Sequence, residues 1–266
     1  MNLIERQMLD ILKRGRAEHG FVAVKAEFEA EGTRVDEFLR LIELARKAGL
    51  SIGLKIGGCE AMRDLIESKQ YGVEYIIAPM VETPYALRKF IESKNKIYSK
   101  DEQFDTEFLF NVETITAFNN LSAMSKIAAA EDAKTGFVFG RVDFALSHGF
   151  NRKSVNDDAV TEYVLRTAEV ARDSGLPLVV GGSIAVEAVP VLRKIHDIHL
   201  TRFETRKIIF GADAALGKSD VVKGLQDAVA FELLWLKNKR DYYTTLSRED
   251  HSRIEMLEER SRVLTN

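Results

Sequence analysis

The chain has 266 residues, of which 45% are hydrophobic and 30% are charged, a composition typical of a globular protein with a large apolar core. Its formal net charge is −3, from 38 basic and 41 acidic residues, which excludes a global positive field that would favour nucleic acid or an anionic membrane. Cys59 is the only cysteine, so an intramolecular disulfide and a metal cluster held by several cysteines are excluded as well.

The N-terminal segment mixes charged residues into its apolar positions. It reads MNLIERQMLDILKRGR and lacks the uninterrupted apolar core of a signal peptide. No stretch of the sequence approaches the roughly 20 apolar residues that a membrane-spanning helix needs. We therefore expect a cytoplasmic protein that has neither nucleic acid nor a membrane among its partners.

Short runs of β-branched or aromatic residues alternate along the chain with segments of helical period. This alternation predicts parallel strands joined by crossover helices. Residues 35–48 form the clearest helix candidate, because apolar side chains recur there at spacings of three and four residues, and Gly49 then provides a helix stop. The seven clear strand candidates are residues 21–26, 51–56, 74–78, 108–112, 136–140, 178–180 and 207–210.

An eight-stranded barrel needs one more strand, and residues 96–99 and 199–203 are the two candidates. We favour the second. No linker rich in glycine, serine or proline divides residues 20–215, so we expect a single domain. The predicted fold is an α/β TIM (β/α)8 barrel over residues 1–218, with an N-terminal helix before it and a C-terminal helical extension, residues 219–266, after it.

The C-terminal extension has two interpretations. Residues 219–240 have the apolar pattern of a helix and residues 241–266 are mostly charged, as expected for a last barrel helix with a solvated end. Phe231, Leu233 and Trp235, however, add more apolar side chains than one barrel helix needs. The segment could therefore form a subunit contact.

Two carboxylates stand out because each closes a short apolar run. Glu113 follows residues 108–110, and Asp143 follows residues 137–140, about one βα unit later. If both runs are neighbouring parallel strands, the two side chains emerge at the rim where α/β barrels build their active sites. Two hard oxygen ligands at this rim suit Mg²⁺ or Mn²⁺.

Asn111 and Arg141 each lie two residues before one of these carboxylates. Strand alternation would point each of them toward the same side as its carboxylate, where Asn111 could bind substrate. Arg141 could form a surface ion pair, or it could clamp a substrate carboxylate through two parallel hydrogen bonds.

Further polar residues follow other predicted strands. Glu27 could be a base or an ordinary loop acid, and His148, five residues after Asp143, could transfer protons or simply cap a helix. Gly181, Gly182 and Ser183 follow a strand and precede a predicted helix. Their amides could hold a phosphate or carboxylate at the helix N-terminus.

Four segments, by their order and spacing, resemble the HpcH/HpaI aldolase and citrate lyase β-subunit family of the phosphoenolpyruvate/pyruvate barrel superfamily. They are LKIGG at 54–58, VEYIIAPMVETPYA at 73–86, FNVETITAFNNL at 110–121 and FVFGRVDFALSHG at 137–149, and the resemblance covers residues 20–215. It implies that Glu113 and Asp143 hold a divalent metal, which binds the carboxylate and keto oxygen of pyruvate or a similar 2-oxo acid. It also implies a homo-oligomer, either a trimer or a trimer-based hexamer.

The chain departs from the family pattern at three places. Lys55 stands where the aldolases carry an arginine that binds the keto oxygen, and it could also form a Schiff base. Arg141 stands where the family usually has proline. At the exit of the first strand the aldolases have an Asp–His pair, whereas residues 25–29 read KAEFE and leave Glu27 as the candidate base.

These observations support three hypotheses about function. The first is a metal-dependent carbon–carbon lyase or aldolase that cleaves a pyruvate-related 2-oxo acid through a stabilised enolate. The second is an acyl-CoA lyase of the citrate lyase or malyl-CoA type. The third, from another class, is a barrel that binds a metabolite without turning it over.

Overall fold

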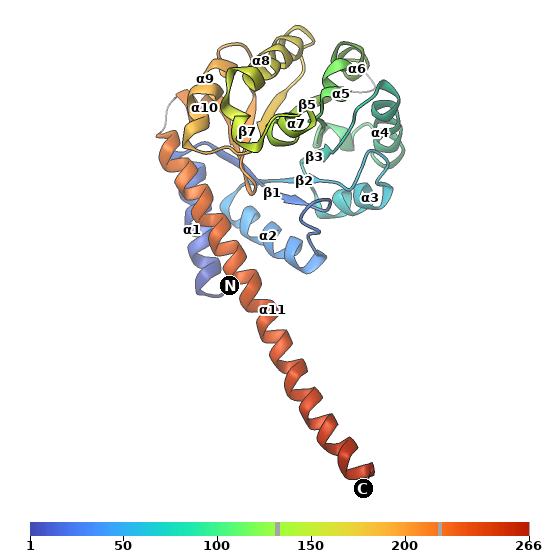
Figure 1. Cartoon of the computed structure of the whole chain (residues 1–266), viewed down its shortest axis with the longest axis vertical. Coiled ribbons are helices and arrows are strands. Elements are labelled where there is room, and N and C mark those ends of the chain that lie inside the picture. Colours follow the sequence, from blue (N-terminus) through green and yellow to red (C-terminus); the bar gives the residue numbers. More distant parts are fainter. Residues whose placement is uncertain (131–133, 218–219, 266) are drawn as a thin grey trace.

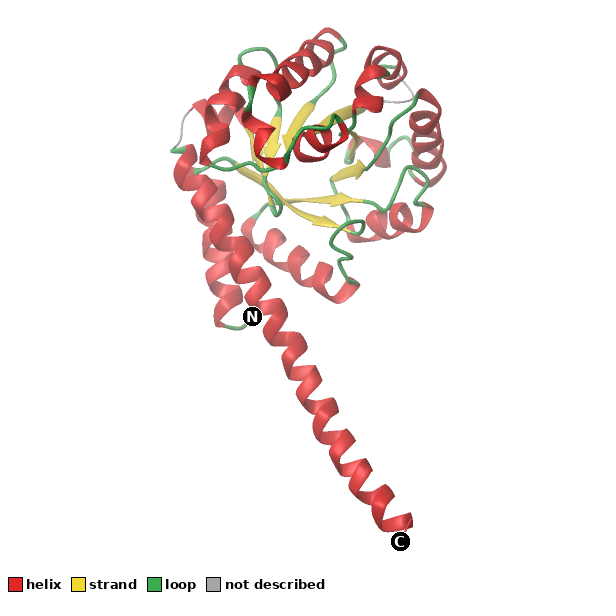
Figure 2. Cartoon of the chain, in the orientation of Figure 1, coloured by secondary structure: helices red, strands yellow, loops and turns green. Residues whose placement is uncertain are grey.

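Eight strands close into a barrel in the computed structural model, which describes residues 1–130, 134–217 and 220–265 (Figures 1 and 2). The strands are β1 Phe21–Glu27, β2 Ser51–Lys55, β3 Tyr75–Ala78, β4 Glu107–Val112, β5 Thr135–Gly140, β6 Leu178–Gly181, β7 Arg202–Glu204 and β8 Ile208–Gly211. The predicted barrel fold is confirmed. Its eighth strand is the second of the two candidates, at β7.

Helices surround the strands (Figure 1). The predicted helix at 35–48 is α2, and Gly49 ends it in the left-handed conformation with φ 73°. The helices are α1 Leu3–Glu18, α2 Val35–Ala48, α3 Met62–Tyr71, α4 Pro84–Ile97, α5 Ile115–Asn119, α6 Leu121–Ala128, α7 Arg141–Ser147, α8 Asp158–Asp173, α9 Val189–His196, α10 Ala212–Gly217 and α11 Val221–Thr265, with short 3-10 turns at Glu102–Phe104, Arg152–Asn156 and Val186–Ala188.

The last strand runs in the opposite direction from the other seven. β1 to β7 are paired in parallel, but β8 is antiparallel to both β7 and β1. The reason is the length of the connection, because three residues, 205–207, join β7 to β8, and a parallel crossover needs about a dozen. The reversal places Lys207, just before β8, at the rim where the parallel strands end.

The barrel interior is filled in layers. Ile77, Leu109, Val138 and Val179 form an apolar layer in the middle. At the amino-terminal end of the strands, Arg202 pairs with Glu107, and its guanidinium lies 4.6 Å from the ring centroid of Tyr75.

Charged side chains fill the barrel at the other end. The ammonium of Lys25, which is 6% exposed, lies 2.5 Å from a carboxylate oxygen of Glu204 and 3.3 Å from one of Glu27. Burial alone would lower the pKa of Lys25, but the two carboxylates raise it above its usual value. The ammonium therefore stays charged inside the barrel.

The C-terminal helix α11 lies beside α1 (Figure 1), and an Arg14–Asp227 ion pair at 2.8 Å joins them. Phe231 is 0% exposed and Trp235 is 5% exposed, so both pack inside the protomer. Their burial in the protomer leaves little of either side chain for a partner subunit, whereas Leu233 is exposed, and the subunit contact predicted for this segment stays a prediction.

The predicted boundary between residues 218 and 219 lies outside the described residues. Within the described part of the chain, no helix combines the length and apolar character that crossing a membrane requires.

Replacement of Lys25 by methionine is expected to lower the free energy of unfolding by about 3–5 kcal/mol, because it leaves Glu204 and Glu27 buried without their cation. Urea denaturation measures the change. The matched control is Lys47→Met, because Lys47 pairs with Glu43 and its side chain is 50% exposed. An exposed pair contributes less than about 1 kcal/mol, so equal losses in the two variants would contradict the central role of Lys25.

Candidate active site

The carboxyl ends of the parallel strands carry a dense cluster of polar and charged side chains. Each comes from the end of a strand or from the residue beside it, the position from which α/β barrels build active sites. Three strands contribute Lys25 and Glu27 (β1), Lys55 (β2) and Glu204 (β7). Asn111 lies in β4 and Glu113 directly follows it, and Lys207 lies in the turn before β8.

Glu113 is the most deeply placed acid of this cluster, at 1% exposed. One carboxylate oxygen accepts the backbone N–H of Met80 at 3.0 Å, and the other accepts the amide N–H of Asn111 at 2.5 Å. Met80 adopts φ 51°, a strained left-handed conformation for a side chain of this size, as it donates this hydrogen bond. Gly140 leaves room for the carboxylate, since a Cβ there would lie 2.9 Å from its Oε2.

The surroundings of Glu113 raise its pKa. Burial is the largest cause, and the negative charge of Asp143 adds to it, whereas Lys55, Met80 and Asn111 act in the opposite direction.

Asn111 lies beside Glu113 and is 4% exposed. Its Nδ2 donates to Glu113, but its Oδ1 is buried and has no hydrogen-bond partner among the described residues. An unpartnered buried carbonyl oxygen costs free energy, and sites of this kind usually receive an ion, a water or a ligand.

Lys55 lies between two acids. Its ammonium is 3.6 Å from Glu113 Oε2 and 3.4 Å from Glu29 Oε2, and its side chain is 11% exposed. Because an ammonium has three donors, Lys55 can keep one of these partners and offer an N–H to a substrate oxygen.

Glu27 ends β1 beside this pair. Burial alone would raise its pKa, but the positive charges of Lys25 and Lys55 outweigh burial and hold the pKa below its usual value. Glu27 is therefore a carboxylate at neutral pH. It can accept a proton, although the neighbouring cations make it a weak base.

Asp143 occupies a different local structure from the one predicted. β5 ends at Gly140, and Asp143 lies in the first turn of α7, where its side chain is exposed. The alternation argument, which treated residues 141–143 as strand, was wrong.

Arg141 is 0% exposed and does not point into the cluster as a free carboxylate clamp. All five of its N–H donors are used, by the carbonyl oxygens of Val155, Gly181, Gly182 and Ser183 and by Oδ1 of Asn156. Burial lowers its pKa to about 10, so the guanidinium is still charged at neutral pH. Arg141 holds a loop in place, which corrects its predicted role.

The Gly181–Ser183 segment is the loop that Arg141 holds. Gly182 has φ 85° and Ser183 has φ 50°, and their carbonyl groups point to the guanidinium. The next α-helix, α9, begins only at Val189. The carbonyl oxygens of Gly182 and Ser183 bind Arg141, and a 3-10 turn, Val186–Ala188, leads into α9, so the predicted anion site at a helix N-terminus stays a prediction.

His148 packs away from the acids, at the C-terminal end of α7. One ring nitrogen lies 2.8 Å from the hydroxyl of Tyr163, and the ring stacks on Phe150 with centroids 4.4 Å apart. Among the described residues, His148 contacts Tyr163, Phe150 and Phe144, and not Glu113 or Asp143. The structure therefore does not bring this predicted proton carrier to the cluster.

Sequence reasoning missed three members of the cluster: Lys25, Glu204 and Lys207. Lys207 is 3% exposed, pairs with Glu31 and lies 5.7 Å from the ring centroid of Trp235. The alternation of Lys25 and Glu27 along β1 was an available signal. Lys207 gave none, because its place at this rim depends on the reversal of β8.

The donors around Glu113 are oxygen atoms, the ligand type that hard divalent cations prefer. Among the described residues no group of three His, Cys, Asp or Glu side chains is arranged to hold a metal. Two carboxylates, Glu113 and Asp143, together with the unpartnered Oδ1 of Asn111, nevertheless supply oxygen ligands of the type that Mg²⁺ and Mn²⁺ prefer.

Comparisons with known proteins bear on the fold. No family model and no curated protein matches the chain. An HpcH/HpaI aldolase from Desulfitobacterium hafniense superposes with a TM-score of 0.58 and 14% identity, over 77% of this chain and 84% of that one. An HpcH/HpaI aldolase/citrate lyase family protein from Burkholderia cenocepacia gives 0.58 and 12%, over 92% and 90%. The chain has the fold of these aldolases.

A variant of the citrate synthase SbnG has the same fold, with a TM-score of 0.56 and 16% identity over 87% of this chain and 90% of that one. At 12–16% identity these likenesses concern the path of the backbone. They confirm the fold that the sequence resemblance implied, and the chemistry has to be argued from the side chains of this chain.

Glu113→Gln is expected to leave the metal-free protein at least as stable as the native one at pH 7. The pKa of Glu113 is raised on folding, so the folded state binds its proton more tightly and the contribution of Glu113 to stability falls as the pH rises. The stability difference should therefore shrink as the pH is lowered toward 4, which urea denaturation at several pH values measures. Glu92→Gln, on the surface, is the control. A variant clearly less stable at pH 7 would show that the pairing with Lys55 outweighs burial.

Proposed function

We propose that the protein is a cytoplasmic, divalent-metal-dependent carbon–carbon lyase or aldolase that acts on a pyruvate-related 2-oxo acid. The observation that carries the proposal is the buried Glu113 carboxylate, with the unpartnered amide oxygen of Asn111 beside it and Lys55 facing it. The fold supports it, because neighbours described as an aldolase and a citrate synthase both catalyse reactions at carbon–carbon bonds.

Glu113 and Asp143 would hold Mg²⁺ or Mn²⁺, with Asn111 Oδ1 as a further oxygen ligand. When bound, the cation supplies positive charge at the oxygen where an enolate develops. Burial of Glu113 strengthens this arrangement, since a charge interaction is less screened away from water.

Lys55 binds the substrate carboxylate in this proposal. Its ammonium already lies between two carboxylates, Glu29 and Glu113, so a substrate carboxylate would replace the more exposed partner, Glu29. A lysine makes a point contact where the guanidinium of an arginine would make two parallel hydrogen bonds. We therefore expect weaker orientation of the substrate and tolerance of a smaller acid.

Glu27 accepts the proton in the cleavage direction. It takes the proton of the hydroxyl group on the carbon that becomes the aldehyde, and the electrons of the breaking carbon–carbon bond pass to the enolate of the 2-oxo acid. The enolate carbon then takes the proton back from Glu27, which regenerates the carboxylate. Lys25 and Lys55 keep Glu27 ionised for each turnover.

Calorimetric titration with Mn²⁺ in the presence of pyruvate is expected to show metal-dependent binding. Glu113→Gln and Asp143→Asn should each weaken it at least about 100-fold, because each removes an ionised ligand. The affinity should fall as the pH is lowered, at a higher pH than for an ordinary glutamate, because protons compete at a group whose pKa is raised.

Asp158→Asn is the control for that titration, because its side chain is 89% exposed on α8 and far along the chain from both ligands. If the Glu113→Gln and Asp143→Asn double variant bound pyruvate with unchanged affinity, that result would contradict the proposed metal site.

A substrate panel separates the proposed reaction from its alternatives. Release of pyruvate from 2-oxo-3-deoxy acids is the expected result, and Lys55→Ala should lower kcat/KM about 10- to 100-fold while Lys55→Arg keeps most of it. Cleavage of acyl-CoA thioesters alone would instead indicate a lyase of the citrate lyase or malyl-CoA type. No turnover, together with ligand-induced thermal stabilisation, would indicate a barrel that only binds a metabolite.

A further inference from the structure

The C-terminal half of α11 projects from the barrel as a single helix (Figure 1). From residue 244 to residue 264 every side chain is exposed except that of Met256, which is half-buried. We call residues 244–265 the tail. A projecting helix lacks the main source of helical stability in proteins, which is the packing of an apolar face against another element.

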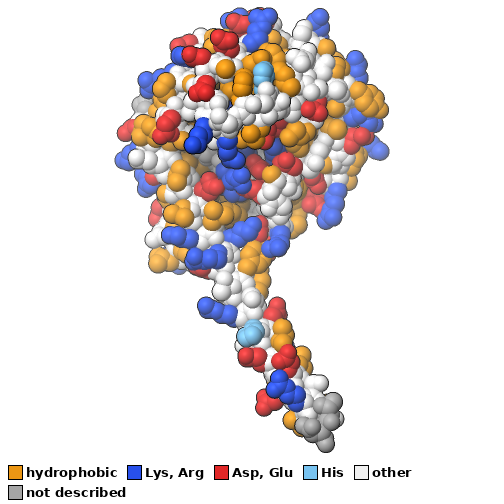
Figure 3. Space-filling view, viewed as in Figure 1, with side chains coloured by type: hydrophobic (Ala, Val, Ile, Leu, Met, Phe, Trp, Pro, Cys, Tyr) orange, Lys and Arg blue, Asp and Glu red, His pale blue; other side chains and the backbone are white. Residues whose placement is uncertain are grey.

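The tail carries apolar side chains between its charged ones (Figure 3). Leu246 is 42% exposed, Leu257 is 48% exposed and Leu264 is 86% exposed. They fall on positions that alternate in steps of three and four residues, the 3.5-residue repeat of a coiled-coil seam. We call these positions the seam: Tyr243, Leu246, Asp250, Arg253, Leu257, Arg260 and Leu264.

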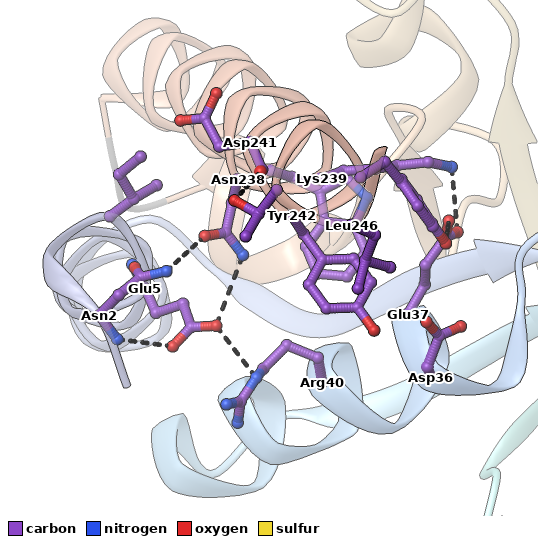
Figure 4. A pocket seen from close by; sticks show the side chains of 14 residues that line it. Asn2, Glu5, Asp36, Glu37, Arg40, Asn238, Lys239, Asp241, Tyr242 and Leu246 are labelled. Atoms are coloured by element: carbon purple, nitrogen blue, oxygen red, sulfur yellow. Dashed lines mark hydrogen bonds and ion pairs between the residues drawn. The ribbon is translucent and has the colours of Figure 1, made fainter. Parts of the chain in front are cut away.

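A groove of about 450 Å³ lies at the base of the tail, between α1, α2 and α11 (Figure 4). Apolar and aromatic side chains line it, among them Ile4, Trp235, Tyr242 and Leu246. Tyr243 is fixed at its edge, because its hydroxyl donates to Glu37 at 2.6 Å. The seam and the groove therefore adjoin each other on α11 and share Tyr243 and Leu246, and the groove lining also carries charged side chains such as Glu5, Asp36 and Arg40.

We propose that two copies of this chain pair through their tails, side by side and antiparallel, and that the end of each tail fills the groove of the other copy. The charges on the seam favour this partner and this direction. In the antiparallel register, Asp250 of one copy lies opposite Arg253 of the other, and Leu246 lies opposite Leu257. A parallel pair would place Asp250 opposite Asp250 and Arg253 opposite Arg253.

The same register explains the position of the groove. When Leu246 lies opposite Leu257, Leu264 lies opposite Lys239 and Val263 lies opposite Arg240, and Lys239 lines the groove. Val263 and Leu264 are 73% and 86% exposed in the single chain. The two helices overlap over about 25 residues, or about 38 Å. The pairing does not depend on the proposed catalytic function.

Light scattering coupled to size exclusion tests the pairing on the full chain. The expected mass is twice the 30.0 kDa of one chain, which differs from the trimer or hexamer that the family resemblance implies. Leu246→Glu combined with Leu257→Glu should raise the dissociation constant at least about tenfold and give a 30.0 kDa species. The midpoint of the barrel's thermal unfolding, followed by circular dichroism, should not change. Phe104→Glu is the matched control, because Phe104 is 85% exposed but lies outside α11. A monomeric native protein, or a mass that the double variant does not change, would overturn the proposal.

Charge reversal tests the direction of the pair. Asp250→Arg should weaken association, because it places arginine opposite Arg253, and adding Arg253→Asp should restore it. Disulfide trapping in a Cys59→Ser background gives a second readout. A mixture of Leu246→Cys and Leu257→Cys chains should form a mixed disulfide, whereas each variant alone should not. Disulfides formed by Leu246→Cys alone, or no rescue by the double reversal, would overturn the antiparallel register.

Discussion

The ammonium of Lys25, enclosed in the barrel between Glu204 and Glu27, is the constraint to which the rest of the rim is adjusted. A charge removed from water is tolerated only when opposite charges surround it, so two carboxylates must reach the barrel axis at this level. Glu204 reaches it because Gly181 on the neighbouring strand has no side chain, and a Cβ there would lie 3.2 Å from the Glu204 carboxylate. The catalytic proposal for Glu27 follows from the same ion pairs, which keep it ionised.

The reversed β8 adds a further charged residue to this rim of the barrel. In a fully parallel barrel the eighth strand would present its last residue at this rim, whereas here the rim receives Lys207 at the start of the strand. Lys207 pairs with Glu31 in the loop after β1 and lies against Trp235 of α11. The reversal thus connects the rim of the candidate active site to the C-terminal helix through the buried ammonium of Lys207.

The strands and the position of Glu113 at a strand end could be predicted from the sequence, because a strand buried on both faces reads as an apolar run and its end can be located from the first polar residue. The role of Glu113 as a metal ligand stays a prediction. The sequence was not sufficient for the direction of β8, since a run such as residues 207–210 looks the same in either direction and only the three-residue connection hinted at a hairpin. Arg141 was misread for a related reason. β5 ends at Gly140, and a residue in the first turn of a helix does not follow strand alternation.

A hydrogen bond joins the N-terminal end of the chain to the C-terminal helix. Nδ2 of Asn2 donates to Oδ1 of Asn238 at 2.7 Å, so the first residues of α1 and the point where α11 leaves the barrel are fastened to each other. Because β8 runs backward, the chain returns to its own start after one circuit of the barrel. The barrel is therefore suited to circular permutation: a short linker from residue 238 to residue 2 would join the ends without spanning the fold, and the chain could be reopened in a surface loop elsewhere.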